Sequence, residues 1–168
     1  MIKSFDFENI KNKIFIRENI YFLAIIFITF FLDRYSKLQI IKNYNDNTFY
    51  FNDFINLDLI WNTGIGFGLL TTVDNLIYNI ISSIIGIVII IIIYISFKSD
   101  KFDKIVFSFI TGGALGNFYD RLVFKGVPDF IDLHYGNFHW FTFNLADIFI
   151  SIGIIAFIIK GFFIKNNK

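Results

Sequence analysis

The length of its apolar runs most constrains how this chain can fold. The clearest run extends from Leu76 to Phe97 and contains seven consecutive isoleucine or valine residues at 87–93. Because the hydrocarbon core of a bilayer is about 30 Å thick, a helix needs roughly 20 mostly apolar residues to cross it. Similar runs at about 20–41, 105–122 and 143–164 predict four transmembrane helices in all. With 55% hydrophobic residues, the chain is also more apolar than an ordinary soluble domain.

Basic residues predict which ends of these helices face the cytoplasm. Lys and Arg flank the runs at both termini and between the second and third runs: Lys3, Lys11, Lys13, Arg17, Lys98, Lys101, Lys104, Lys165 and Lys168. Cytoplasmic segments carry an excess of these residues, so we expect both termini and the middle connection in the cytoplasm. We expect the first run to be retained rather than cleaved as a signal peptide, because Asp33, Arg34 and Lys37 stand where a cleavage site would follow.

The two outward connections hold most of the remaining polar residues. The first, from Asn43 to Leu70, alternates polar residues with Phe, Leu, Ile and Trp, a period-two pattern typical of short strands. The segment from Lys3 to Arg17 mixes Phe and Ile with Lys and predicts a short interfacial helix. Since no linker or internal repeat divides the chain, we expect a single membrane-embedded domain over residues 1–168.

Ionisable and polar residues in or beside the apolar runs are functional candidates, because charge in hydrocarbon is costly. Asp33 and Lys37 are four residues apart on one helix face, where they form either a structural ion pair or part of a site. The segment Asn62-Thr-Gly-Ile-Gly-Phe-Gly68 has glycine at alternate positions from Gly64. Such spacing allows close backbone approach by another chain, or simply a turn or bulge.

The third apolar run combines small and polar residues. Gly112 and Gly116 predict a tight contact between helices. Asn117, Asp120 and Arg121 share one face of the same helix near the outer surface. Packing alone does not explain these three residues, and an arginine there can donate a forked pair of hydrogen bonds to a carboxylate or carbonyl.

The last run opens with Asn144 and Asp147, which lie on one helical stripe. They are either an N-cap and a first-turn acid or part of a site. Asp129 also lies at the outward rim on the predicted topology, so a third connection that folds back onto the last helix would bring it to Asp147. Two carboxyl groups in one site share a single proton, which is the chemistry of aspartyl proteases.

Other catalytic chemistries lack the residues that they need. The sequence contains no cysteine, no Gly-x-Ser-x-Gly segment and no His-Glu-x-x-His segment. His134 and His139 occur near Asp132 in the third connection, and we interpret them as loop residues rather than as a metal site. A net charge of +1 gives no indication of nucleic-acid binding.

Taken together, the four polar segments resemble the lipoprotein signal peptidase family (signal peptidase II), matched in order and spacing from about Phe31 to Gly153. The resemblance implies an all-α integral membrane protein of four transmembrane helices, with a small extracytoplasmic β-sheet and an outer loop helix. It implies an aspartyl endopeptidase whose catalytic dyad is Asp129 and Asp147. The family's other polar positions, which would orient the dyad and the substrate, fall on Asp33, Lys37, Asn62, Gly64, Asn117, Asp120, Arg121 and Asn144.

The substrate implied by the resemblance is a prolipoprotein whose lipobox cysteine already carries diacylglycerol, cut on the N-terminal side of that cysteine. The enzyme would be a multi-pass protein of the bacterial cytoplasmic (inner) membrane, in contact with membrane lipids, with its active site facing outward. Sensitivity to globomycin-type peptides is implied, and neither a metal nor an organic cofactor is required. Ile65, Gly66 and Pro128 depart from the family's usual pattern, but none of them replaces a catalytic group.

Two other functions would use the same residues differently. A small transporter or channel subunit would relay protons or cations through acids near the bilayer midplane, whereas the acids here cluster at the outer ends of the runs. A structural scaffold would oligomerise through Gly112 and Gly116, which leaves Asp129, Asn144 and Asp147 without a role.

Overall fold

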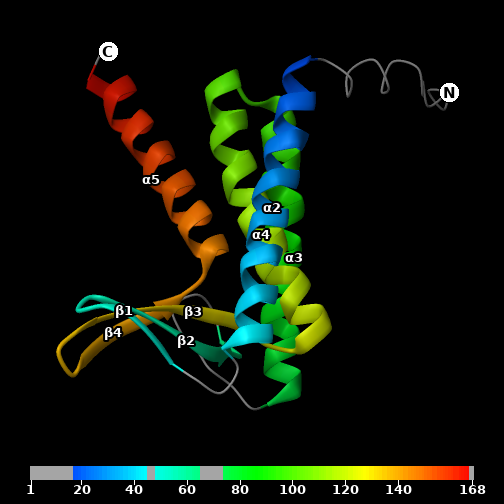
Figure 1. The fold of residues 1–168 in the computed structure, drawn as a ribbon. Helices are drawn as coiled ribbons and strands as arrows, with labels where there is room; N and C mark the ends of the chain where they lie inside the picture. Colours follow the sequence, from blue (N-terminus) through cyan, green and yellow to red (C-terminus); the bar gives the residue numbers. More distant parts are fainter. Residues whose placement is uncertain (1–16, 45–47, 65–73, 167–168) are drawn as a thin grey trace, which may run out of the picture.

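The computed structural model describes residues 17–44, 48–64 and 74–166, and these form four long helices and a four-stranded sheet (Figure 1). The helices are α2 (Arg17–Asn43), α3 (Asn75–Lys98), α4 (Lys101–Phe124) and α5 (Leu145–Asn166). The strands are β1 (Phe49–Asn52), β2 (Ile55–Asn62), β3 (Val127–Tyr135) and β4 (Phe138–Phe143). Each apolar run is therefore a helix, while the interfacial helix expected before α2 falls outside the described residues.

Three of the described helices are long and apolar enough to cross a membrane: α2 from Asn19, α3, and α5 as far as Phe163. The run at 87–93 is helical although isoleucine and valine favour strands in water, because an isolated span in lipid must pair its own backbone groups. The fourth expected span, α4, does not meet the same criterion. Its sequence includes Lys101, Asp103, Lys104, Asp120 and Arg121, which lower its mean hydropathy.

Helix α4 lies at the centre of the bundle, in contact with α2, α3 and α5. Glycines make these contacts close: a Cβ atom on Gly112 or Gly116 would collide with Thr29 or Asp33 of α2, and one on Gly113 would lie 2.5 Å from the backbone oxygen of Ala146. The small-residue face is therefore occupied by helices of the same chain. This packing removes the contact surface on which the scaffold interpretation depended.

The polarity of the bundle is reversed relative to a soluble protein. Side chains on α3 such as Ile80, Ile84, Ile87 and Ile91 are about half exposed, and they recur at helical spacing along one stripe. The fully buried side chains are instead largely polar: Lys37, Asn144, Thr111, Asp33, Asp120, Pro128, Ser96 and Ser108. An apolar exterior around a polar interior is the arrangement expected where the solvent is lipid.

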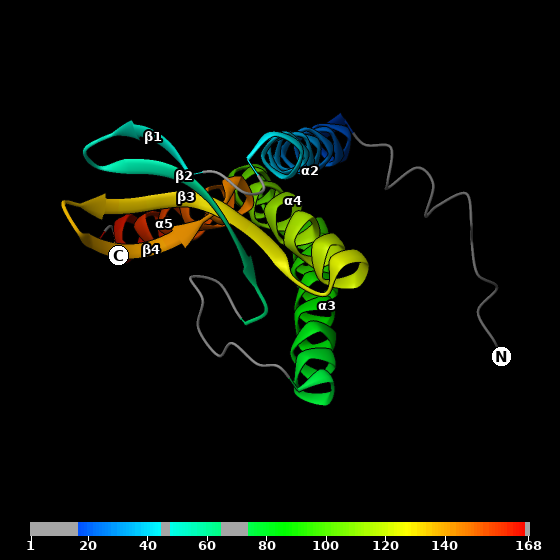
Figure 2. The same cartoon turned by 60° about the horizontal axis from the view of Figure 1, so that its bottom comes forward.

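The sheet lies across one end of the bundle and extends beneath α5, as Figure 1 and Figure 2 show. Its order is β1-β2-β3-β4 with every neighbour antiparallel. The strands predicted in the first outward connection are confirmed as β1 and β2, and the third connection adds β3 and β4. An outer loop helix does not occur in residues 48–64 or 125–144.

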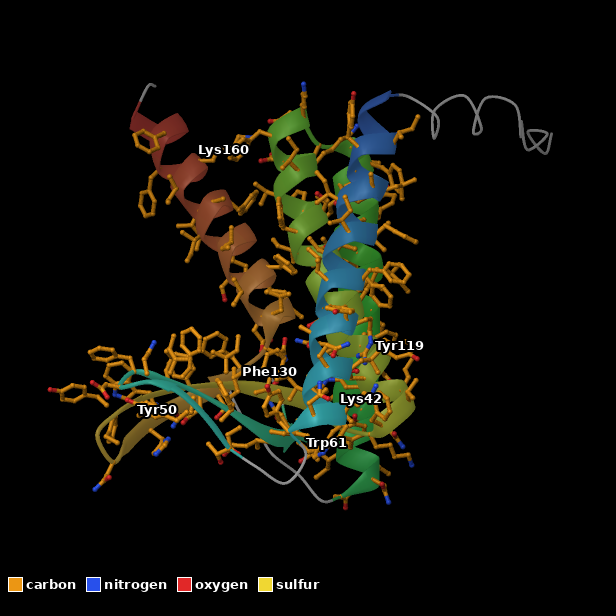
Figure 3. All side chains as sticks on the ribbon, viewed as in Figure 1. Lys42, Tyr50, Trp61, Tyr119, Phe130 and Lys160 are labelled. Carbon is orange, nitrogen blue, oxygen red and sulfur yellow. The ribbon has the colours of Figure 1, made fainter. Side chains whose placement is uncertain are left out.

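The two ends of the bundle differ in character. In Figure 3, Tyr50, Trp61 and Phe130 lie at the sheet end, whereas Lys160 lies toward the opposite end of α5. At that far end Lys160 pairs with Asp100 and Asp103 across 2.6 and 2.7 Å. The aromatic side chains of the sheet and the ion pairs of the far end thus lie at opposite ends of the bundle.

The packing of α4 predicts that Gly113→Ala lowers thermal stability, because the backbone oxygen of Ala146 cannot rotate away from the added methyl group. Gly161→Ala is the matched control, since a Cβ atom there meets nothing within 4 Å, and alanine favours a helix over glycine by about 1 kcal/mol. Melting of both variants in detergent measures the effect. A Gly113→Ala protein as stable as Gly161→Ala would contradict the packing described.

Candidate active site

All ten residues singled out from the sequence for the dyad and its support lie in the described part of the chain. Hydrogen bonds and ion pairs connect them into one cluster where α2, α4, α5, β2 and β3 meet. The cluster lies at the sheet end of the bundle. The sequence spacing placed the helical residues on shared faces and Asp129 in the third connection, and the fold brings these subsets together.

Asp129 lies near the beginning of β3, where the residue is 3% exposed. Asn62, at the end of β2, donates from Nδ2 to Asp129 Oδ2 across 2.9 Å. Asn144 donates from Nδ2 to Asp129 Oδ1 across 2.6 Å. The pairing of β2 with β3 sets this geometry, because Asn62 and Asp129 lie close along adjacent strands whose register matches Ile60 to Asp129.

Asp147 is held in the first turn of α5 by an amide on a different helix and by its own N-cap. Asn117 of α4 donates from Nδ2 to Asp147 Oδ1 across 2.8 Å. The backbone N–H of Asn144 donates to Asp147 Oδ2, and the backbone N–H of Asp147 donates to Asn144 Oδ1, both across 3.1 Å. This reciprocal pair is a capping box. Asn144 is therefore the N-cap and Asp147 a first-turn acid, as one of the two alternatives predicted, and both residues also belong to the site.

Asn144 therefore contacts both carboxyl groups at once. Its side-chain oxygen and backbone N–H cap α5 and hold Asp147, which leaves its side-chain amide free to donate to Asp129. The side chain is fully buried, so water does not compete for these bonds. A single asparagine thus fixes the relative position of the beginning of α5 and the beginning of β3.

Burial raises the pKa of Asp129 to about 7, and the nearby Asp147 carboxylate adds to the rise. The amide donors of Asn62 and Asn144 act in the opposite direction but are outweighed. A carboxyl group with this pKa is protonated in a large fraction of molecules at neutral pH. The pair can therefore hold one proton under physiological conditions, which is the state that acid–base catalysis by two carboxyl groups requires.

A buried cluster of charges lies behind the two carboxyl groups. Lys37 Nζ of α2 lies 2.8 Å from Asp33 Oδ2 and 2.8 Å from Asp120 Oδ2 of α4. Arg34 pairs with the other oxygen of Asp120. Two cations thus neutralise two buried acids by direct ion pairing, which is the condition for burying charge at tolerable cost.

This charge cluster orients the residues around Asp147. Lys37 donates to Asn117 Oδ1 across 2.7 Å, which turns the amide nitrogen of Asn117 toward Asp147. Asp33 Oδ1 accepts from the backbone N–H of Ala146 across 3.0 Å, which anchors the first turn of α5. The i,i+4 pair is therefore a structural ion pair that also sets the geometry of the site.

Arg121 of α4 forms a hydrogen bond with the segment that follows β2. Its Nη2 donates to the backbone oxygen of Gly64, while Asn62 Oδ1 accepts from the backbone N–H of Gly64 across 2.8 Å. Its Nη1 is buried and has no hydrogen-bond partner among the described residues. A forked donor with one free arm beside the carboxyl groups is suited to bind a backbone carbonyl.

Two contributors to the cluster were not predicted. Arg34 pairs with Asp120, and the Tyr78 hydroxyl donates to the backbone oxygen of Arg121 across 3.1 Å. An arginine inside an apolar run is itself a signal, so Arg34 was open to detection. Tyr78 lies on α3 among apolar residues and carries no comparable signal in the sequence.

Known proteins share both the sequence and the fold of this chain. The family model for signal peptidase (SPase) II matches residues 25–163. The lipoprotein signal peptidase of Pelagibacter ubique (strain HTCC1062) is 48% identical over 160 residues, which cover 94% of this chain and 96% of that protein. The lipoprotein signal peptidase of Anaplasma phagocytophilum (strain HZ) is 40% identical over 147 residues, which cover 84% and 92%. A bacterial membrane enzyme solved by the in meso method at 2.3 Å resolution superposes with a TM-score of 0.73 and 29% identity, over 88% of this chain and 91% of that one.

The raised pKa of Asp129 predicts how its replacement changes stability with pH. The protonated form of Asp129 is favoured in the folded protein. Its contribution to the free energy of unfolding is therefore greatest below pH 3.8 and is lost as pH rises to about 7. Relative to that of Asp129→Asn, the free energy of unfolding of the wild type should fall by up to roughly 4 kcal/mol between pH 4 and pH 8. Melting of both proteins in detergent across this range measures the difference, and a gap that stays constant or moves in favour of the wild type would contradict it.

Proposed function

The chain belongs to the signal peptidase II family and cleaves signal peptides from lipoproteins, and we propose that Asp129 and Asp147 form the aspartyl dyad that does so. The observation that carries this proposal is the position of Asn144, which donates one hydrogen bond to each carboxyl group. The two acids are buried together at the end of the bundle. The raised pKa of Asp129 supports the same assignment.

In the proposed mechanism, Asp129 begins in the protonated form and Asp147 as the carboxylate. Asp147 takes a proton from water as the water oxygen attacks the scissile carbonyl carbon, and Asp129 donates its proton to the carbonyl oxygen. The resulting diol collapses when Asp147 gives its proton to the departing nitrogen and Asp129 recovers a proton from the diol. No metal or organic cofactor takes part in these steps.

The remaining polar residues support the dyad in three ways. Asn62 and Asn144 hold Asp129, and Asn117, oriented by Lys37, holds Asp147. Arg121 and the turn at Gly64 bind the substrate backbone, because Nη1 of Arg121 has no hydrogen-bond partner among the described residues and can donate to an additional acceptor. Asp33 and Asp120 complete the charge cluster behind them, which keeps Lys37 in position.

The chain is a multi-pass bacterial membrane protein, and we propose the following orientation for it. Helix α4 is the fourth span, since its Asp120 pairs with α2 and its Arg121 donates to Gly64 rather than facing lipid. Both termini lie in the cytoplasm, in agreement with the basic residues there and at the α3–α4 connection. The sheet and the dyad then face outward from the cytoplasmic membrane, and residues 1–168 form one membrane-embedded domain.

The substrates are prolipoproteins, and we propose that cleavage falls on the N-terminal side of a lipobox cysteine that carries diacylglycerol. A site at the rim of the bilayer leaves the acyl chains in contact with membrane lipids while the peptide backbone enters between the sheet and α4. Globomycin-type peptides would compete for the same surface. The transporter alternative is less favoured, because Asp129 lies on β3 rather than on a helix that could cross the membrane.

The dyad predicts that Asp129→Asn and Asp147→Asn each lower kcat for a diacylglyceryl lipopeptide by at least about a thousandfold, since either change removes a proton-transfer group. Asp58→Asn is the control, because that carboxyl group accepts from Thr48 on the sheet surface and its loss should change kcat little. Cleavage by each purified variant is followed by chromatography of the peptide products. Full turnover by either dyad variant would reject the assignment, and loss of turnover in Asp58→Asn would show that the assay reports general damage.

A further inference from the structure

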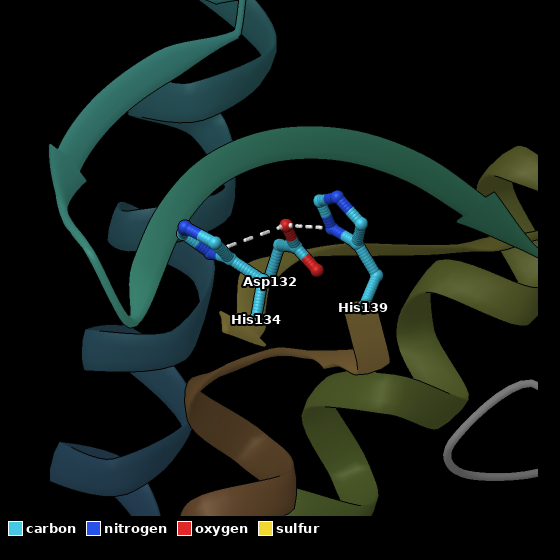
Figure 4. Close-up of side chains that lie close together, drawn as sticks. All are labelled: Asp132, His134 and His139. Carbon is cyan, nitrogen blue, oxygen red and sulfur yellow. Dashed lines mark hydrogen bonds and ion pairs between the residues drawn. The ribbon is translucent and has the colours of Figure 1, made fainter. Parts of the chain in front are cut away.

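A second group of ionisable side chains gathers on the β3–β4 hairpin, apart from the dyad. Asp132 and His134 lie on β3 and His139 lies on β4, so interpreting the histidines as loop residues was wrong. One ligand-type atom from each of the three lies within 4.8 Å of the others. Figure 4 shows both imidazole rings turned toward the Asp132 carboxylate.

The strand pairing alone assembles this group. Asp132 and His134 are two residues apart on β3 and so project from the same face. His134 is the cross-strand partner of His139, which places the second imidazole on that face as well. Asp129 lies three residues before Asp132 on β3, so its carboxyl group projects from the opposite face and the two sites are separate.

The contacts inside the group leave one buried nitrogen unsatisfied. Asp132 Oδ2 lies 2.7 Å from His139 Nδ1 but 3.8 Å from His134 Nδ1, and the longer distance exceeds that of a hydrogen bond. His134 is 6% exposed, and its Nδ1 has no hydrogen-bond partner among the described residues. A buried polar atom without a partner costs about 1–3 kcal/mol, so a ligand on this nitrogen would stabilise the folded protein.

A further oxygen lies on the same face. Asn56 of β2 is the cross-strand partner of Asp132, so its side chain projects from the same side of the sheet. Its Oδ1 is also buried without a hydrogen-bond partner among the described residues. Two unsatisfied atoms therefore accompany the Asp132 carboxylate, and both are electron-pair donors.

We propose that Asp132, His134 and His139 bind one divalent transition-metal ion, for which Zn²⁺ is the best match. Two imidazoles and a carboxylate are a preferred ligand set for zinc, with ligand distances near 2.0–2.2 Å from about four ligands. The three ligand atoms lie within 4.8 Å of one another, so the side chains would turn toward the ion as it binds. The fourth position is filled by Asn56 Oδ1 or by water, which enters past His139, a side chain that is 56% exposed.

The ion connects β3 to β4 and thereby stabilises the hairpin that carries Asp129. It does not touch the reacting atoms, since the two groups project from opposite faces of β3. The proposal is also independent of the dyad assignment, because metal binding is measured without substrate.

The sequence makes the binding test unusually direct. The chain contains two histidines and no cysteine, so imidazole ligation of a metal can come only from this pair. The whole protein is purified in detergent without a polyhistidine tag and stripped with chelator. Titration with Co²⁺ should then give the visible absorption of an imidazole-bound ion at one equivalent per chain, and Zn²⁺ should displace it and raise the melting temperature by mass action.

Variants separate this site from general binding to carboxylates. His139→Ala should weaken Zn²⁺ binding by at least about tenfold. Because the His139 side chain is exposed, we expect this variant to fold normally. Asp132→Asn should act in the same direction, whereas Asp58→Asn on β2 should bind as the wild type does. Absence of stoichiometric binding in the stripped wild type, or unchanged binding in His139→Ala, would overturn the proposal.

Discussion

The hydrogen bonds of Asn144 are the interaction on which the rest of the site depends. This residue caps α5 through its backbone and side-chain oxygen and donates to Asp129 through its amide nitrogen. The beginning of α5 and the beginning of β3 are thereby fixed relative to each other, and the two carboxyl groups with them. The bonds are strong because they lie in a buried region where water does not compete. Burial also raises the pKa of Asp129, so one structural feature both positions the pair and lets it retain a proton.

A polar interior of this kind is stable only if its groups satisfy one another. Lys37, Asp33 and Asp120 form mutual ion pairs between α2 and α4, and Arg34 completes the balance of charge. The helices approach closely enough for these pairs because α4 carries glycines opposite α2 and α5. Glycine packing and ion pairing are thus two parts of one arrangement. The exposed isoleucines of α3 do not belong to it, because they form the apolar surface of that helix.

Much of this architecture could be predicted from the residues alone. Apolar run length predicted the helices, and alternation in the first outward connection predicted β1 and β2. Strands β3 and β4 were not predicted. Burial alternates along β3 from residue 130 to residue 134, and residues 131–135 alternate apolar with polar side chains, so a period-two pattern was present there and was not used. Helical spacing placed Asn117, Asp120 and Arg121 on one face, yet the convergence of Asp129 with Asp147 depends on strand pairing far along the chain. For the same reason the approach of His134 to His139 could not be read from local sequence.

In the proposed site Asp129 and Asp147 share one proton, and infrared titration of the carboxylic-acid band can detect it. The protein is studied in detergent, with Asp129→Asn used to assign the band. We expect a protonated Asp129 that titrates near pH 7 and that titrates at lower pH in Asp147→Asn, because the neighbouring negative charge is removed. An Asp129 that is already ionised at pH 5, or one whose titration is unchanged in Asp147→Asn, would show that the two carboxyl groups do not share a proton.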